Sequence, residues 1–435
     1  MSESAKLSYP KTAVLGLQHM FAMFGATILV PLLSGLSVQV TLIGVGIGTI
    51  IFHFFAKGRV PAFLGSSFAF LVGIQLITDP VTGLFAGSDL SHQEKLAYAT
   101  GGIFVAGLVY LLFSLLIYLV GAKKFMEWMP PIVTAPTVIL IGIMLAPFAI
   151  SQSSNNLILA VITLLIVVIT ASWGRGMVRI IPILLGIGGA YIIALMMHFM
   201  GMTNPNGSPI LDFSSAAGAG LVGLPPFMLP RFNVLAILVM IPFSFATIAE
   251  HVGDMVALST IAKEDYIKEP GLARTLIGDG IATCFSGFIG GPASTTYGEN
   301  VGVVALTRVF NTRVVQLAAV YAVVLGFSPI FASLIYSVPA AIIGGASFML
   351  YGMIAAVGVR NLVDGKVDMS KTKNLTIIAV MLVTGLGLRF GPRIAFSLGT
   401  AEVPIDRLGI AIAVVLGVVL NLILPDEENE ESREG

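Results

Sequence analysis

Two short segments, PAFLGSSFAFLVG (61–73) and GPASTTYGENVG (291–302), decide the fold of this chain. Each is rich in Pro, Gly, Ser or Thr and interrupts apolar sequence, so neither is expected to form one continuous helix. We expect extended backbone at Ser67-Phe68 and at Tyr297-Gly298. A matched pair of broken segments is typical of an inverted repeat with a binding site at the membrane midplane. The alternative, that small residues only let helices pack closely, does not explain the ionisable Glu299.

The surrounding sequence is that of a membrane protein. The 435 residues are 56 % hydrophobic and only 11 % charged, and the mean hydropathy is +0.97. A spanning helix needs about 20 mainly apolar residues. This rule predicts an all-α polytopic protein with fourteen spans in two halves of seven, separated by a polar connection that contains MTNPNGSPILDF (202–213). The predicted spans lie near 13–33, 40–55, 61–78, 97–120, 126–149, 156–174, 177–199, 234–258, 271–290, 292–307, 314–335, 338–357, 374–390 and 405–424.

The distribution of positive charge predicts the orientation. Of the 23 Lys and Arg residues, all but five lie on one predicted side of the membrane, in loops, in the tails or at span ends. The five on the other side are Lys95, Arg231, Arg389, Arg393 and Arg407. Because cytoplasmic loops carry the excess of Lys and Arg, we expect a multi-pass protein of the cell (inner) membrane with both termini in the cytoplasm. The first apolar run, from Ala13, is too long for a signal peptide and is expected to be a retained span.

Composition excludes several partners. Acidic and basic residues balance, 23 against 23, so no basic surface for nucleic acid is indicated. The single cysteine, Cys284, excludes an intrachain disulfide and a thiolate cluster. We expect neither a metal nor a cofactor.

Ionisable residues inside the spans are the candidates for function, because a charge in hydrocarbon costs about 3 kcal/mol or more. They are Glu250, Asp254, Asp279 and Glu299, with His19, His53 and His251 as titratable companions. Glu250 and Asp254 are four residues apart and share a helix face, where mutual repulsion favours a shared proton. This predicts proton coupling, and the alternative is a structural acid bonded to a neighbouring helix. Adjacent His251 is expected to point elsewhere, His53 to be interfacial, and Asp279 is left open between packing and transport.

The second broken segment offers groups for a planar ligand. Glu299 lies where extended backbone is expected to pass into helix, beside free backbone N–H groups. Tyr297 is suited to lie flat against a planar ring. From the first segment, Ser66, Ser67 and Phe68 offer backbone donors and an aromatic face. Phe68 and Tyr297 have the alternative of facing core or lipid.

At these residues the sequence resembles the nucleobase–cation symporter-2 family, also called the nucleobase–ascorbate transporters, and most of all its bacterial uracil permeases. The similar motifs are QHMFAMFGATILVP (18–31), VPAFLGSSFAF (60–70), IAEHVG (248–253) and TTYGENVGVVALTR (295–308). The last contains the family signature, here Glu299, Asn300, Gly302, Thr307 and Arg308. The resemblance covers nearly the whole chain.

The resemblance implies two inverted repeats of seven spans and a homodimer. A core domain would comprise residues 13–120 and 234–335, and a gate domain residues 121–199 and 338–424. The base would lie between short strands in spans three and ten and the eighth span.

The resemblance also implies roles for single residues. Glu250 and Glu299 would accept hydrogen bonds from ring N–H groups, the backbone amides of Phe68 and Gly298 would donate to carbonyl oxygens, and Tyr297 would pack beside the ring. Asp254, Glu250 and His19 are the expected proton-coupling residues.

The expected function is import of uracil by proton symport. Glu299 resembles the uracil branch, whereas Asp254 stands where that branch usually has His and resembles purine-transporting relatives. A xanthine- or uric-acid-type substrate is therefore the alternative. An intramembrane enzyme is the remote alternative, since the sequence has no HExxH or GxSG motif and its IGDG (277–280) does not match GxGD.

Overall fold

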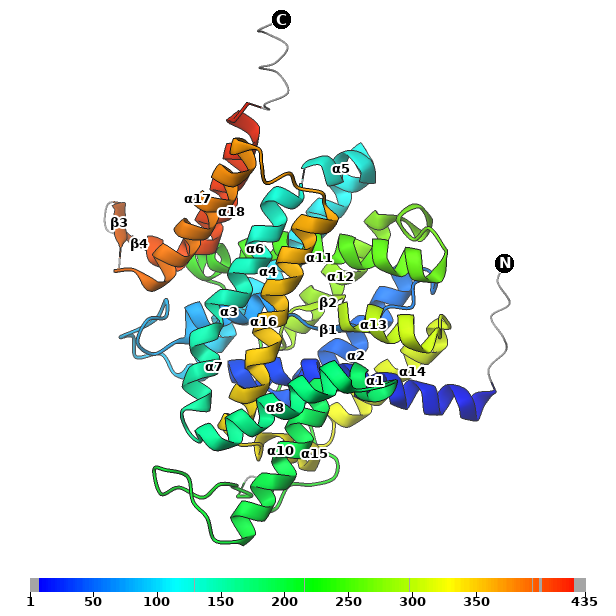
Figure 1. Cartoon of the computed structure of the whole chain (residues 1–435), viewed down its shortest axis with the longest axis vertical. Helices are drawn as coiled ribbons and strands as arrows, with labels where there is room; N and C mark the ends of the chain where they lie inside the picture. Colours follow the sequence, from blue (N-terminus) through cyan, green and yellow to red (C-terminus); the bar gives the residue numbers. More distant parts are fainter. Residues whose placement is uncertain are drawn as a thin grey trace, which may run out of the picture.

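The computed structural model describes residues 8–128, 130–214, 216–296, 298–392, 394–398 and 401–425. It is a predominantly helical molecule with two short strands at its centre (Figure 1). The helices of the first half are α1 (Tyr9–Ser34), α2 (Val38–Phe55), α3 (Ala69–Thr78), α4 (His92–Val120), α5 (Ala122–Trp128), α6 (Pro131–Met144), α7 (Ala146–Ser153), α8 (Leu157–Trp173), α9 (Met177–Ile180) and α10 (Pro182–Phe199). The helices of the second half are α11 (Val234–Ala262), η1 (Ile267–Gly271), α12 (Leu272–Phe288), α13 (Gly298–Thr307), α14 (Thr312–Gly326), α15 (Pro329–Tyr336), α16 (Ala340–Asp364), α17 (Thr372–Phe390), η2 (Ile405–Leu408) and α18 (Gly409–Ile423).

The two broken segments meet as an antiparallel strand pair. β1 (Leu64–Ser66) pairs with β2 (Ser294–Thr296), with Leu64 opposite Thr296 and Ser66 opposite Ser294. β1 leads into α3 and β2 leads into α13, each ten residues long. Because the strands are antiparallel, the two helices leave the pair in opposite directions.

The strands lie earlier in the sequence than predicted. Ser67 directly follows β1, and Phe68 has helical backbone angles (φ −70°, ψ −26°) as the N-cap of α3. Gly298 is the first residue of α13, and Tyr297 lies outside the described residues. The prediction of extended backbone at Phe68 and Gly298 was therefore wrong. The β-branched pair Thr295 and Thr296 favours the strand, which ends where the helix begins.

The helices pack in two groups that combine both halves of the chain. In the first group α2 and α4 pack against α12, α4 also packs against α11, and α1 and α2 pack against α14. In the second group α6, α7 and α8 pack against α16, α8 against α10, and α17 against α18 and α6. Figure 1 shows α17 and α18 side by side at one edge, next to the hairpin of β3 (Ala395–Leu398) and β4 (Ala401–Pro404).

Several helices are long and apolar enough to cross a membrane. Within the described residues there are eight such helices, α6 and α7 counting as one, or nine with α14 and α15, which form an 85° bend. α3, α8 and α18 are shorter apolar helices within three other predicted spans. The chain is thus a multi-pass membrane protein. The fourteen-span prediction depends on the short pieces as well, because length and composition alone identify fewer.

Contacts between the connecting segments follow the two predicted sides of the membrane. Arg59 and Glu269, both predicted to lie inside, form an ion pair of 3.0 Å. Arg231 and Glu94, both predicted to lie outside, form one of 2.8 Å. Each of these two contacts joins segments that are predicted to lie on the same side.

Candidate functional site

The candidate site is built around the β1–β2 pair and the helices α3 and α13 that follow it. The N–H of Ser67 extends the pair by donating to the Ala293 carbonyl (2.9 Å). The Ser67 hydroxyl is buried and has no hydrogen-bond partner among the described residues. α3 begins two residues later without a side-chain cap, so its first N–H groups remain available as donors. This end of the pair therefore offers a hydroxyl and backbone donors to a polar ligand.

The acidic face of α11 lies against the other end of the pair. Glu250 is half-buried and Asp254 is buried, and both belong to one unbroken helix. A Cβ atom placed on Gly298 would lie 3.8 Å from Asp254 Oδ1, so this carboxylate approaches the first residue of α13. Glu299 is in the first turn of α13, but its side chain lies outside the described part of the structure. The structure thus brings Asp254 close to Gly298.

His19 on α1 contacts the second broken segment. Its Nε2 lies 2.7 Å from Asn300 Oδ1, and Asn300 Nδ2 donates to the Pro61 carbonyl (3.0 Å). Because the Asn300 amide nitrogen is the donor to Pro61, its oxygen accepts from His19, which assigns the proton to Nε2. Asn300 therefore joins α1, α13 and the segment before β1.

A buried polar network behind β2 was not predicted. His251 Nδ1 lies 2.9 Å from Asp279 Oδ2, and His251 Nε2 lies 2.9 Å from Thr275 Oγ1. The Thr296 N–H donates to Asp279 Oδ2 (3.3 Å), and Thr296 Oγ1 lies 3.2 Å from His251 Nδ1. His251 faces α12, as expected for a residue that does not share the face of Glu250 and Asp254. Its contact with Thr296 of β2 was not predicted. The sequence signal for this network was the presence of His251 and Asp279 in two consecutive apolar spans.

His53 lies in the last turn of α2, where the sequence predicts an interfacial position, and it is enclosed by protein. It is buried, and its Nε2 lies 2.9 Å from the Ala62 carbonyl, two residues before β1. The Leu64 N–H donates to Thr49 Oγ1 (3.0 Å). Two side chains of α2, His53 and Thr49, therefore contact β1 and the residues just before it. The sequence did not show this because the turn that brings residues 56–63 back along α2 has no periodic pattern.

The buried His251–Asp279 pair is expected to contribute to stability. Replacing His251 by Ala leaves the Asp279 carboxylate buried without its imidazole partner, which costs about 3–5 kcal/mol. We expect a clear fall in the thermal unfolding midpoint of the purified protein in detergent. His92→Ala, at an exposed residue of α4, is the matched control. An equal midpoint in both variants would show that the pair is not stabilising.

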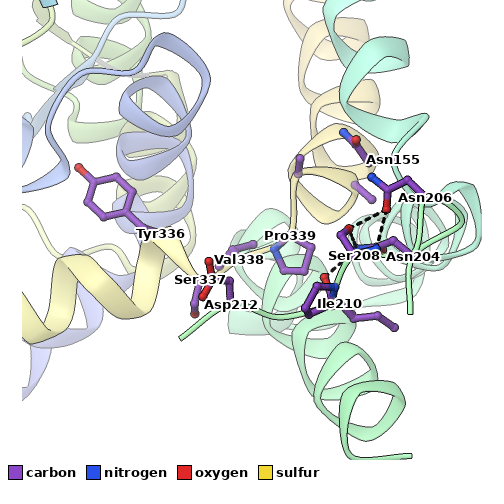
Figure 2. A pocket seen from close by; sticks show the side chains of 13 residues that line it. Asn155, Asn204, Asn206, Ser208, Ile210, Asp212, Tyr336, Ser337, Val338 and Pro339 are labelled. Atoms are coloured by element: carbon purple, nitrogen blue, oxygen red, sulfur yellow. Dashed lines mark hydrogen bonds between the residues drawn. The ribbon is translucent and has the colours of Figure 1, made fainter. Parts of the chain in front are cut away.

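A separate cavity lies away from the strand pair (Figure 2). It has a volume of about 250 Å³ and lies between the α7–α8 turn, the connection after α10 and the α15–α16 turn. In Figure 2, Asn204, Asn206 and Ser208 lie on one side and Tyr336 to Pro339 on the other. None of its lining residues is a predicted site residue. All three segments are predicted to lie outside.

Comparison with known sequences identifies the family. A family model described as Permease family (Xan_ur_permease) matches residues 10–394. The uracil permease of Bacillus subtilis is 40 % identical, and the match covers 96 % of this chain and 93 % of the relative. The putative pyrimidine permease RutG of Escherichia coli is 39 % identical over 96 % of this chain and 90 % of the relative.

Solved transporter structures share the fold. The transmembrane domain of the cyanobacterial bicarbonate transporter BicA superposes with a TM-score of 0.59 at 17 % identity, covering 95 % of this chain and 98 % of that domain. The murine anion transporter Slc26a9, in its inward-facing state, superposes with a TM-score of 0.64 at 12 % identity. The match covers 96 % of this chain and 69 % of that chain. The family and the fold indicate a transporter rather than an enzyme. The chain therefore belongs to the permease family of the nucleobase–ascorbate transporters.

Proposed function

We propose that this protein imports uracil by proton symport and binds the base between β1–α3, β2–α13 and α11. The observation that carries the proposal is the strand pair, followed on both sides by a helix start, with the acidic face of α11 against it. The names of the relatives, uracil and pyrimidine permeases, support the choice of substrate.

The chemistry of uracil fits these groups. Its ring has two N–H donors and two carbonyl acceptors, which require carboxylate acceptors and N–H donors from the protein. Glu250 and Glu299 are the proposed acceptors. The backbone amides of Phe68 and Gly298, at the starts of α3 and α13, are the proposed donors, and the positive ends of the two helix dipoles favour the carbonyl oxygens.

Two further groups complete the proposed binding site. The Ser67 hydroxyl is the available polar side chain at the end of β1. Tyr297 is proposed to pack beside the ring.

The proton is proposed to reside on the Glu250–Asp254 pair. Two carboxylates on one helix face in a poorly solvated site repel each other, so one proton is shared and the pair titrates as a unit. Protonation lowers the charge that moves past the gate helices together with the base. His19 is proposed as a further coupling residue, through Asn300 and the segment before β1.

The proposed architecture has fourteen spans in two inverted repeats. Residues 13–120 and 234–335 would form the core domain, and residues 121–199 and 338–424 the gate domain. The two packing groups of helices support this division. The contacts between segments of the same predicted side support the alternation of sides. The excess of Lys and Arg on one side supports the proposed orientation, with both termini in the cytoplasm and the protein in the inner membrane. A homodimer is part of the proposal and is tested by the mass of the protein–detergent complex.

Uptake into proteoliposomes tests the function. Purified protein is reconstituted, an inward proton gradient is imposed, and accumulation of radiolabelled uracil, xanthine and uric acid is compared. We expect accumulation of uracil that an ionophore abolishes. The second candidate substrate is a purine, because Asp254 stands where the uracil branch usually has His. Accumulation of xanthine or uric acid in place of uracil would favour this candidate.

A further inference from the structure

A groove lies between the C-terminal end of α2 and the N-terminal part of α14. Its volume is about 530 Å³, and it opens to the surroundings. Three of its residues are exposed apolar side chains: Ile50, Phe54 and Val320. Phe54 is 78 % exposed, so the groove continues into the apolar outer surface of the two helices. In a membrane-spanning helix such a surface contacts the acyl chains of lipids.

The groove has a polar end with positive charge. Lys57 and Gln316 line it together with buried His53, and Gln316 Nε2 lies 3.4 Å from His53 Nδ1. Lys57 is exposed and forms no ion pair with any described residue. An apolar wall that ends in an uncompensated ammonium group matches a phospholipid with an anionic headgroup.

Lys57 occupies a backbone position that favours glycine. It follows the C-cap of α2 with φ 54°, in the left-handed region. Gly58 N–H donates to the His53 carbonyl (2.7 Å) and Lys57 N–H to the Phe54 carbonyl (3.3 Å), which is a Schellman motif. Thr312 Oγ1 at the start of α14 donates to the Gly58 carbonyl (2.9 Å) and fixes this turn against the groove. The ammonium group is therefore attached to a rigid turn.

We propose that this groove binds an anionic phospholipid, with its phosphate at Lys57 and Gln316 and an acyl chain along Ile50, Phe54 and Val320. The inference goes beyond the proposed transport and uses the proposed orientation, in which Lys57 lies at the cytoplasmic surface. The groove is connected to the substrate site, because His53 contacts the Ala62 carbonyl just before β1. A lipid in the groove would therefore stabilise the position of His53 and, through it, of the segment that leads into β1.

The test uses Lys57→Gly, which removes the charge and suits the left-handed backbone. Lys366→Gly is the matched control, since Lys366 has φ 51° in the same motif after α16 and lies outside the groove. Phosphatidylglycerol or phosphatidylcholine with identical acyl chains is added to the purified protein in detergent. Retained lipid is counted by native mass spectrometry, and the thermal unfolding midpoint is measured.

We expect phosphatidylglycerol to raise the midpoint of the wild type and of Lys366→Gly by several degrees more than phosphatidylcholine does. In Lys57→Gly this difference should fall by at least half, with fewer retained phosphatidylglycerol molecules. Phe54→Ala should lower retention of both lipids, because it removes the apolar wall.

Two results would overturn the proposal. Lys57→Gly and Lys366→Gly could retain phosphatidylglycerol equally, or inorganic phosphate could reproduce the shift, which would indicate an anion site without a lipid. Both readouts are independent of uracil uptake, so failure of the lipid site and failure of the proposed transport are distinguishable.

Discussion

Replacing Asp254 by Asn is expected to abolish gradient-driven accumulation of uracil while leaving its equilibrium binding intact. Asn keeps the shape and polarity of the side chain, and its amide can still form hydrogen bonds, but it cannot take up the coupling proton. Asp254 is buried on the same face of α11 as Glu250 and approaches the start of α13, so its charge is close to the proposed base. With a neutral Asn at this position, the base can still cross the membrane, but its movement is no longer coupled to that of a proton.

Counterflow measurements in the same vesicles provide the control. With uracil on both sides and no gradient, Asp254→Asn should still exchange labelled for unlabelled base. The competing interpretation is a structural role for Asp254, as a partner of His19 or of a backbone amide. pH-driven accumulation near the wild-type level in Asp254→Asn would exclude this residue as the coupling group.

Replacing Glu250 by Ala is expected to weaken the binding of uracil. Loss of the carboxylate leaves a ring N–H without an acceptor, which costs about 1–3 kcal/mol, or about 5- to 150-fold in Kd. Glu299→Ala should have an effect of the same size, because its carboxylate is the proposed acceptor for the other N–H group. Accumulation should be lost in Glu250→Ala as well, since this residue belongs to the coupled pair.

Isothermal titration of the purified variants with uracil measures these changes. Glu264→Ala provides a matched control, because Glu264 is an exposed acid just after α11. Wild-type uracil affinity in both Glu250→Ala and Glu299→Ala would show that neither carboxylate contacts the base.

The sequence predicted the elements whose pattern is local. Apolar runs predicted the long helices, and the Pro, Gly and Ser content of 61–73 predicted that helix would be interrupted there. The grouping of 61–73 with 291–302 around one site came from their matched positions in the two halves, but the antiparallel pairing of β1 with β2 was not predicted. The strand boundaries were wrong by two or three residues, because they depend on where the first turns of α3 and α13 form.

The supporting contacts of the site could not be predicted from one sequence. His251 meets Asp279 and Thr296 only after α11, α12 and β2 have packed together, and no spacing along the chain indicates that contact. The same holds for His53 and Ala62, which depend on the turn after α2. Both contacts involve residues that the sequence marked as polar within apolar segments, but their partners are set by tertiary packing.

The pairing of β1 with β2 has a consequence for biogenesis. β1 and β2 are separated by more than half of the chain, so β1 is synthesised and inserted long before its partner strand exists. Backbone N–H and carbonyl groups without partners cost several kcal/mol each in hydrocarbon. Until β2 is made, the backbone of the segment before α3 therefore needs other hydrogen-bond partners, such as water or a temporary helical form. Formation of the strand pair is consequently a late event that follows the synthesis of β2, and a chain truncated before residue 294 would have a central strand without a partner.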